Sequence, residues 1–404
     1  MARLWGQEYS RYELLRRVGN ISQVAGIKRA VLTEGRQQGV EALFFRTGSG
    51  FGFTVLPSRG MDICSADYQG RSLCWHSAVG EVAPCYFEPE ALGWLRSFFG
   101  GLLTTCGLTY VGDPAVDPDL ASPVWRQAID KARAGESEDA VALIRRALLL
   151  DQFSSIGIHG RISNSPAERV CVDCRWHGDD YTLSAQGTVR EVNSFGENLM
   201  LNRTVSTRLG ESRLTVHDVV TNEGCETTPH MILYHINVGF PVLDDGSTLV
   251  CPSVEAGPRD EEARRGKEDC LRFGLPTAGF VEQVFYHDMA EGPDGATCAA
   301  LVNRSIEPAL AVYVRYNVNQ LPRFIEWKMM GEGAYVVGME PANCLVDGRD
   351  KERAAGTLQF LQPGETREYD LEIGVLVGDQ IDGFEIEASR LAAQAAGKQT
   401  RHSS

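Results

Sequence analysis

The sequence predicts an all-β protein, a large antiparallel β-sandwich with peripheral helices. Short apolar or alternating runs recur along the 404 residues, and turn-forming segments such as GRS, HGDD, TNEG and DDGS separate them. Even spacing of this kind is typical of a sandwich or barrel and not of alternating βαβ units. The glycine-rich segment Phe45–Phe53 is accordingly interpreted as a hairpin turn.

The strand-sized runs extend over most of the chain. In order they are Ala42–Arg46, Gly52–Leu56, Asp62–Tyr68, Val170–Trp176, Tyr181–Val192, Arg213–Thr221, Met231–Val238, Ala299–Asn303, Ala311–Tyr316, Ala334–Met339 and Thr366–Val375. Each is bounded by turn residues and has the length of a strand in a globular protein.

Helices are expected in three places. Gln7–Val18 opens the chain, Phe384–Ala396 closes it, and Pro123–Leu150 repeats apolar residues at roughly helical spacing around a Gly-Glu-Ser break. The last of these is interpreted as a helical hairpin inserted between strands.

Length alone does not decide the number of domains, because large β-sandwiches often exceed the average domain size. We expect one domain over residues 1–395 with a helical insertion at about 117–152, followed by a polar tail at 396–404.

Composition and charge narrow the function classes. With 54 acidic and 39 basic residues the net charge is −15, which disfavours nucleic acid and anionic membranes as partners. The first residues lack the apolar stretch of a signal peptide, and no later stretch is long enough to span a membrane. The eleven scattered cysteines, Cys171 and Cys174 included, are interpreted as reduced structural thiols, which places the protein in the cytoplasm.

Four segments carry a more specific signal. They are LPSRGMDIC (Leu56–Cys64), GIHGRISN (Gly157–Asn164), PHMILYHINVGFP (Pro229–Pro241) and YVVGMEPANC (Tyr335–Cys344). In that order and spacing they resemble the aldose 1-epimerase superfamily, in particular a little-characterised bacterial branch, over about residues 19–377. The resemblance implies a galactose mutarotase-like supersandwich, and by position it matches His159, His235 and Glu340 to the superfamily's site residues. No aspartate matches the one that the superfamily uses to bind substrate.

The resemblance implies an isomerase that interconverts sugar anomers by opening the cyclic hemiacetal. Glu340 is then the base that takes the anomeric proton and His235 the acid that protonates the ring oxygen, a pair suited to proton transfer near neutral pH. His159 would stabilise the charge that builds up during opening. We expect the acid and the base to flank a gap of roughly 5–8 Å, and no cofactor is implied.

Arginine and aromatic side chains are the candidates for binding the sugar. Arg59 and Arg161 can clamp hydroxyls or a carboxylate with their fixed fork of donors, although Arg59 can equally pair with Asp62 in a turn. Arg161 is favoured because a strand would place it on the same face as His159.

Trp327 is the preferred apolar platform for the sugar, since it lies in the mixed setting IEWKMM with Lys328 beside it. Asn237, two residues after His235, completes the predicted substrate-binding set.

Several alternatives stay open. Three histidines, His159, His230 and His235, could bind a metal together with Glu340. Against this, His230 and His235 are an odd number of residues apart on one strand and so face opposite sides. The same pocket could also serve a keto-sugar or sugar-acid epimerase, isomerase or lyase, or a non-catalytic carbohydrate-binding protein. The expected partner is a small-molecule carbohydrate. Whether it is neutral, phosphorylated or a uronate is left open, as is pairing into a homodimer.

Overall fold

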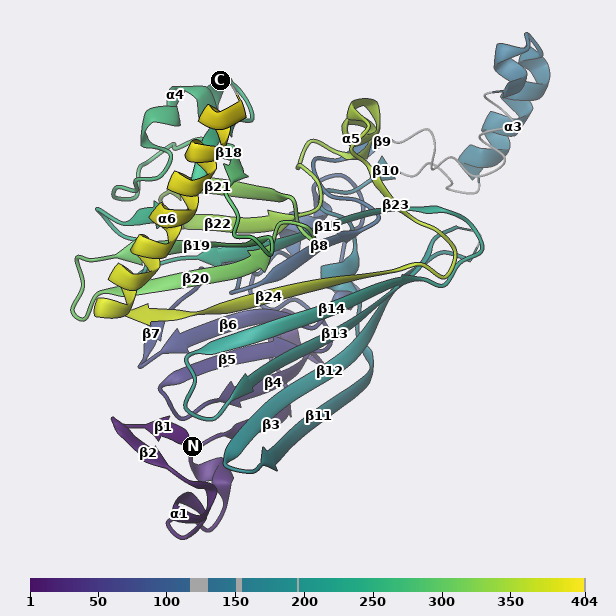
Figure 1. The fold of residues 1–404 in the computed structure, drawn as a ribbon. Coiled ribbons are helices and arrows are strands. Elements are labelled where there is room, and N and C mark those ends of the chain that lie inside the picture. Colours follow the sequence, from purple (N-terminus) through teal and green to yellow (C-terminus); the bar gives the residue numbers. More distant parts are fainter. Residues whose placement is uncertain (117–129, 150–154, 195, 403–404) are drawn as a thin grey trace.

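Antiparallel β-sheets make up most of the structure, a computed structural model that describes residues 1–116, 130–149, 155–194 and 196–402 (Figure 1). Every ladder between named strands of the three large sheets is antiparallel. The predicted fold class is therefore confirmed, and the helices lie outside the sheets.

The largest sheet has eight strands. In spatial order they are β11 (Glu168–His177), β12 (Asp180–Val192), β13 (Asn198–Arg208), β14 (Arg213–Asn222), β24 (Thr366–Val377), β20 (Leu310–Asn317), β19 (Ala296–Asn303) and β16 (Thr248–Val250). Burial alternates residue by residue along β13 and the first part of β14, because one face packs on the core and the other meets solvent.

A second sheet has seven strands. They are β17 (Ser253–Pro258), β18 (Gln283–Met289), β21 (Arg323–Gly331), β22 (Ala334–Ala342), β15 (Thr228–Val238) and β23 (Gln359–Leu361), with β8 (Thr104–Leu108) also paired to β15. Strand β15 is buried on both faces: Tyr234 and Ile236 belong to the main core, whereas Leu233 packs in a smaller apolar cluster on the other side. His235 shares the face of Leu233.

The third sheet has five strands, and two short ladders complete the β structure. The five strands are β3 (Gly26–Val31), β4 (Glu41–Arg46), β5 (Phe51–Leu56), β6 (Asp62–Tyr68) and β7 (Arg71–Ser72). The short ladders pair β1 (Ala2–Leu4) with β2 (Gln7–Tyr9) and β9 (Ala115–Val116) with β10 (Ser155–Ile156). The predicted hairpin turn within Phe45–Phe53 is found between β4 and β5.

The helices differ from the sequence-based expectation. The helix expected over Gln7–Val18 is only α1 (Arg11–Leu15), because Ser10 caps its N-terminus with a capping box and residues 7–9 form strand β2. The C-terminal helix α6 (Asp379–His402) is longer than Phe384–Ala396 and continues through most of the expected polar tail. Two shorter helices, α4 (Glu261–Arg265) and α5 (Arg349–Ala355), were not expected.

Part of the expected helical insertion can be compared with the structure. Helix α3 (Ser137–Leu149) accounts for its second half and extends away from the sheets in Figure 1. The first half, residues 117–129, and residues 150–154 lie outside the described residues. The ladder between β9 and β10 closes the base of the insertion, since Val116 pairs with Ser155.

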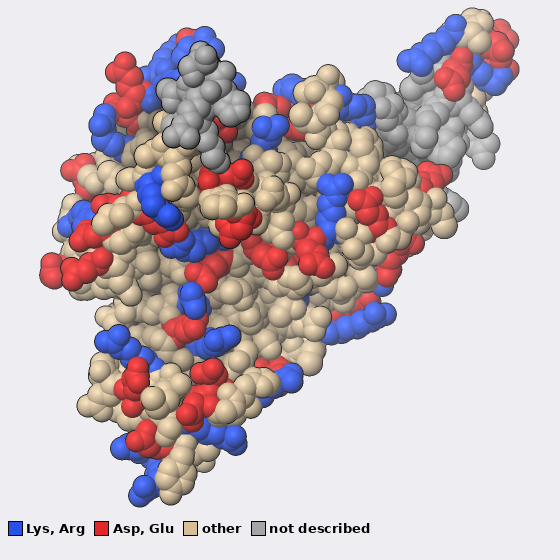
Figure 2. Space-filling view, viewed as in Figure 1, with Lys and Arg blue, Asp and Glu red and all other residues tan. Residues whose placement is uncertain are grey.

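The helices, cysteines and surface charges of the described residues can be compared with the expectations from the sequence. None of their helices is long and apolar enough to cross a membrane. All eleven cysteines are free thiols, and Cys171 and Cys174 lie on strand β11 as expected. On the face shown in Figure 2 acidic and basic side chains are interspersed.

The buried guanidinium of Arg203 joins strands from all three large sheets. Its Nε and Nη2 donate to both carboxylate oxygens of Asp218 at 2.9 and 2.6 Å, and its Nη1 donates to Asp62 and to the Thr105 hydroxyl at 2.8 Å. The Tyr234 hydroxyl donates to Asp218 at 2.8 Å. Because the side chains of Arg203 and both aspartates are fully buried, each charge depends on its partner.

Replacing Arg203 tests this dependence. We expect Arg203→Met to lower the free energy of unfolding by about 3–5 kcal/mol, because two buried aspartates lose their partner. Arg213→Met is the matched control, since Arg213 is half-exposed and its ion pairs contribute about 0–1 kcal/mol. The measurement is the denaturant midpoint of each variant, and equal midpoints would contradict the expectation.

A second variant tests whether the insertion is separable from the sandwich. Because Val116 and Ser155 are paired, residues 117–154 can be replaced by Asn-Gly, which suits a two-residue hairpin. We expect a soluble protein whose thermal midpoint is within a few degrees of the parent and whose circular dichroism shows less helix. Aggregation or loss of the cooperative transition would instead show that the insertion packs as part of the fold.

Candidate active site

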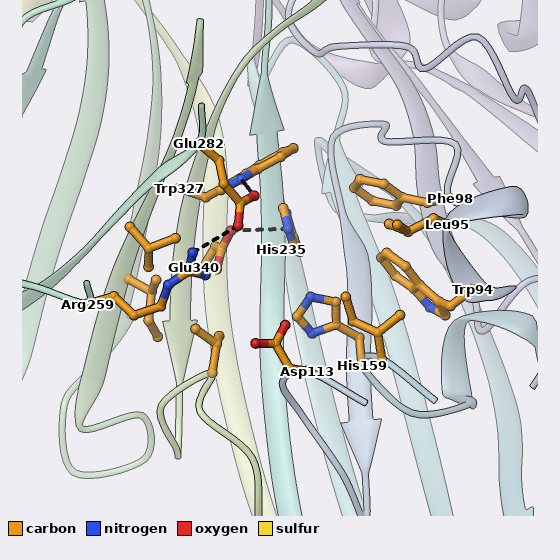
Figure 3. A pocket seen from close by; sticks show the side chains of 14 residues that line it. Trp94, Leu95, Phe98, Asp113, His159, His235, Arg259, Glu282, Trp327 and Glu340 are labelled. Carbon is orange, nitrogen blue, oxygen red and sulfur yellow. Dashed lines mark hydrogen bonds and ion pairs between the residues drawn. The ribbon is translucent and has the colours of Figure 1, made fainter. Parts of the chain in front are cut away.

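A cavity lies on the face of the seven-stranded sheet that is turned away from the main core. It encloses about 550 Å³ of space, a figure that includes its open mouth. Its apolar wall consists of Trp94, Leu95, Phe98, Ile158, Val284, Ile325, Trp327 and Val346. Its polar side chains are Asp113, His159, His235, Arg259, Glu282 and Glu340, as Figure 3 shows.

His235 and Glu340 come from adjacent strands and meet at the floor of the cavity. Strand β15 pairs with β22, and the His235 Nε2 to Glu340 Oε1 distance is 3.2 Å. The two atoms are close but not aligned as a hydrogen bond, and Glu340 Oε1 has no hydrogen-bond partner among the described residues. Gly338 makes room for this carboxyl, because a Cβ there would overlap Glu340 Oε1. The pair is therefore close enough to exchange a proton after a small movement.

His159 reaches the same cavity from a tight turn. Its backbone is left-handed, with φ at 59°, a conformation that costs a residue other than glycine about 1–3 kcal/mol. The turn is held because the His159 N–H donates to Gly112 O and the Gly107 N–H donates to His159 O, at 3.0 and 3.1 Å. The imidazole packs edge-on against Trp94, with ring centroids 5.1 Å apart.

Burial sets the protonation states of the three groups. Desolvation lowers the pKa of His235 to about 3 and that of His159 to about 4, so both imidazoles are uncharged at neutral pH. Desolvation also raises the pKa of Glu340 well above its usual range, and the neighbouring Glu282 raises it further while Arg259 opposes the shift. The buried pair is thus a neutral imidazole beside a carboxyl group that holds its proton more tightly than usual.

Three buried polar atoms in this cavity lack partners among the described residues. They are His159 Nδ1, His235 Nδ1 and Glu340 Oε1, and all belong to residues that line the cavity. Because nearly every buried polar group in a folded protein is hydrogen-bonded, unpartnered groups on one cavity indicate a place for a polar ligand.

The rim carries polar side chains that sequence reasoning did not identify. The Arg259 guanidinium donates to Glu282 Oε1 at 2.9 Å, and Glu282 Oε2 accepts the Trp327 indole N–H at 2.8 Å. Asp113 points into the cavity beside His159 (Figure 3). A signal for Asp113 existed, because it follows a long apolar run, as does Glu340. The loops that carry Arg259 and Glu282 offered no such signal.

The predicted substrate-binding residues divide into two groups. Trp327 lines the cavity, whereas Arg59, Arg161, Asn237 and Lys328 are absent from its lining. The expectation that His159 and Arg161 share a strand face is wrong, since they lie in a turn that leads into a 3₁₀ helix. Arg161 is half-exposed and lies 3.7 Å from Glu197.

Arg59 is fully buried and donates to the carbonyls of Ser163, Val82 and Ser97 at 2.6–2.8 Å. It therefore holds the loops that carry Trp94 and His159, and the alternative Arg59–Asp62 pairing is also replaced, because Asp62 pairs with Arg203.

Lys328 and Asn237 are held by backbone carbonyls. The Lys328 ammonium donates to the carbonyls of Asp269 and Arg272, both at 2.7 Å. Lys328 also alternates with Trp327 along β21, so its side chain lies on the other face of the sheet. The Asn237 amide donates to the carbonyls of Gly100 and His235.

His230 does not supply the third imidazole that the alternative metal site needs. His230 lies on the opposite face of β15 from His235, where its Nδ1 donates to Leu108 O and its Nε2 accepts from the Tyr369 hydroxyl. Within the described ranges no group of three or more histidine, cysteine, aspartate or glutamate side chains is arranged to bind a metal ion.

The expected gap of roughly 5–8 Å between acid and base is wrong for His235 and Glu340, which are in contact. The chemistry does not require that gap. The two oxygens of a hemiacetal are bonded to one carbon and lie closer together than the length of a hydrogen bond, so adjacent groups can reach both at once.

Solved structures support the fold assignment. A candidate aldose 1-epimerase from Klebsiella pneumoniae matches with a TM-score of 0.78 and 24% identity, over 91% of this chain and 87% of that one. A galactose 1-epimerase from Lactobacillus acidophilus matches with a TM-score of 0.53 and 12% identity, over 88% and 99% of the two chains. A galactose mutarotase-like protein from Clostridium acetobutylicum gives 0.52 and 14%, over 88% and 99%.

These structures confirm the predicted fold, at identities that carry no activity with them. A search of curated proteins finds no match. Residues 37–375 match the family described as Domain of unknown function (DUF4432), and the chain therefore belongs to that family.

Proposed function

We propose that this protein is an aldose 1-epimerase-type isomerase that interconverts the anomers of a small sugar by acid–base ring opening. The observation that carries the proposal is the convergence of His159, His235 and Glu340 on one cavity, each with an unpartnered buried polar atom among the described residues. The fold shared with aldose 1-epimerases supports the reaction class but does not by itself assign it.

The protonation states favour His235 as the base and Glu340 as the acid. A neutral imidazole at His235 is ready to accept the anomeric hydroxyl proton, and a protonated Glu340 is ready to donate its proton to the ring oxygen. The O–H bond at the anomeric oxygen and the bond between the anomeric carbon and the ring oxygen break, and a carbonyl and a new hydroxyl form. This reverses the roles that the superfamily resemblance implies for the two residues.

Closure of the open chain runs the same steps backwards. After rotation about the bond next to the carbonyl, the hydroxyl attacks the other face, Glu340 takes back its proton and His235 returns one to the new anomeric oxygen. The transient imidazolium–carboxylate pair is stabilised by the 3.2 Å contact within a site of low polarity. His159, held at the end of a strained turn, can hydrogen-bond the sugar beside this pair.

The aromatic wall suits a sugar as well. Trp94 and Phe98 stack at a centroid distance of 4.5 Å, and Phe98 and Trp327 approach to 6.4 Å, which gives a continuous apolar surface around the His235 ring. Such a surface can cover the C–H face of a sugar ring while the carboxyl and imidazole groups take its oxygens.

Removing either member of the pair tests the proposal. We expect Glu340→Gln and His235→Asn each to reduce the enzymatic rate of anomer interconversion by about 10²- to 10⁴-fold, the usual contribution of a positioned acid or base. The rate is measured by polarimetry or NMR of freshly dissolved aldoses, after subtraction of the spontaneous reaction. Ligand-observed NMR checks that sugar binding persists.

The controls replace the same residue types outside the cavity. His217 and Glu372 lie on the exposed side of the eight-stranded sheet, and His217→Asn and Glu372→Gln should keep the parental rate. A parent that binds aldoses without accelerating anomer exchange would contradict the isomerase proposal and leave a carbohydrate-binding protein. Retention of activity in Glu340→Gln to within a few-fold would contradict the role of the carboxyl group.

The pH dependence separates the two possible role assignments. If Glu340 is the acid, activity falls as pH rises through its elevated pKa, because the donor proton is lost. Activity also falls as pH drops toward about 3, where His235 becomes protonated and cannot accept a proton. We expect kcat/KM to show this alkaline decline, and a rise with pH over the same range would assign Glu340 as the base instead.

A further inference from the structure

The charged groups of the cavity largely cancel one another. Among the described lining residues, Arg259 is the only one with a permanent positive charge. Its Nη2 pairs with Glu282 at 2.9 Å. Its Nε donates to Asp260, also at 2.9 Å. Two carboxylates therefore share one guanidinium, which leaves the described lining no excess positive charge for an anionic ligand.

Asp113 adds a negative charge that no cation in the described lining neutralises. Its side chain lines the cavity beside His159 and forms no ion pair or hydrogen bond with another described residue. Its position is fixed from both sides along the chain, because the Asp113 carbonyl accepts the Tyr110 hydroxyl and the Gly112 carbonyl accepts the His159 N–H. Asp113 is an exposed residue, and its carboxylate faces the cavity without a counterion among the described residues.

Such a carboxylate treats neutral and anionic ligands differently. It accepts hydrogen bonds from sugar hydroxyls, which are charge-assisted and strong. A phosphate or carboxylate on the sugar would instead face the like charge of Asp113, with no free cation in the described lining to receive it.

We propose that the site selects uncharged sugars against sugar phosphates and uronates, and that Asp113 is a specificity-determining residue. This inference rests on the proposed isomerase function and names its substrate class. Asp113 lies outside the four segments that resemble the superfamily. The inference gives it the role of discriminating between sugars by their charge.

The test compares one sugar in three forms on the intact protein. The enzymatic rate of anomer exchange is measured by NMR for glucose, glucose 6-phosphate and glucuronate, and again for xylose and galactose as further neutral sugars. We expect kcat/KM for the neutral sugars to exceed that for the anionic ones by at least about tenfold at low salt, because like charges at close range are costly. Raising the ionic strength should reduce this ratio, since salt screens charges.

Asp113→Asn isolates the residue. We expect the ratio of kcat/KM for glucose over glucose 6-phosphate to fall about tenfold, because the repelling charge is gone while the shape is kept. A change in kcat/KM that is common to both sugars cancels in this ratio. Asp180→Asn is the matched control: it removes one negative charge at the exposed start of β12, and it should leave the ratio unchanged.

The outcomes are distinguishable. Equal or faster exchange of glucose 6-phosphate or glucuronate by the parent would overturn the charge selection while leaving the isomerase proposal intact. A preference for neutral sugars that survives Asp113→Asn would overturn the role of Asp113. If no sugar of any charge is accelerated by the parent, the proposed function itself fails, and direct binding of the same sugars by NMR then decides whether the selection holds for a binding protein.

Discussion

The architecture depends on the ion pairs and hydrogen bonds that the buried Arg203 guanidinium forms. It places a positive charge where strands of three sheets meet and neutralises Asp62 and Asp218, neither of which has access to water. Its partner Tyr234 precedes His235 on β15, and the two side chains point to opposite faces of the strand. The floor of the cavity therefore rests on a polar cluster that tolerates no shift in register, since a slip of one residue would exchange Tyr234 and His235.

The cavity differs from the Arg203 cluster in how its buried polar groups are partnered. Around Arg203 every charge meets a partner, whereas His159, His235 and Glu340 keep polar atoms unpartnered among the described residues. Unpartnered buried groups destabilise a fold by about 1–3 kcal/mol each. The left-handed backbone of His159 adds to this cost, and the surrounding glycines and the Arg59 contacts hold it in place. Strain and unmet hydrogen bonds gathered at one cavity, against a fully paired core, fit a site shaped for a ligand.

The sequence predicted the fold better than the surroundings of the site. Strands such as Asp62–Tyr68 were recognised because alternation and turn residues leave a local signal, whereas β13 and β21 were missed. His235 and Glu340 were matched to the site by the superfamily resemblance, and their convergence was anticipated from that resemblance and not from a local pattern. The roles given to Arg59 and Lys328 were wrong because residue type does not reveal which carbonyls a buried cation will meet. Arg259 and Glu282 lie on loops, whose course depends on tertiary contacts that no local pattern encodes.

Two carboxyl groups in one cavity acquire different chemistry from their surroundings. Glu340 is enclosed by apolar walls and touches a neutral imidazole, so burial favours its protonated form. Glu282 is bound to Arg259 and to the Trp327 indole, and its negative charge in turn helps Glu340 to keep a proton. The Arg259–Glu282 pair thus holds Trp327 in the aromatic wall and also influences the pKa of Glu340. Because burial and these neighbours together set the protonation of Glu340, the same sandwich can support different reactions in proteins that share it.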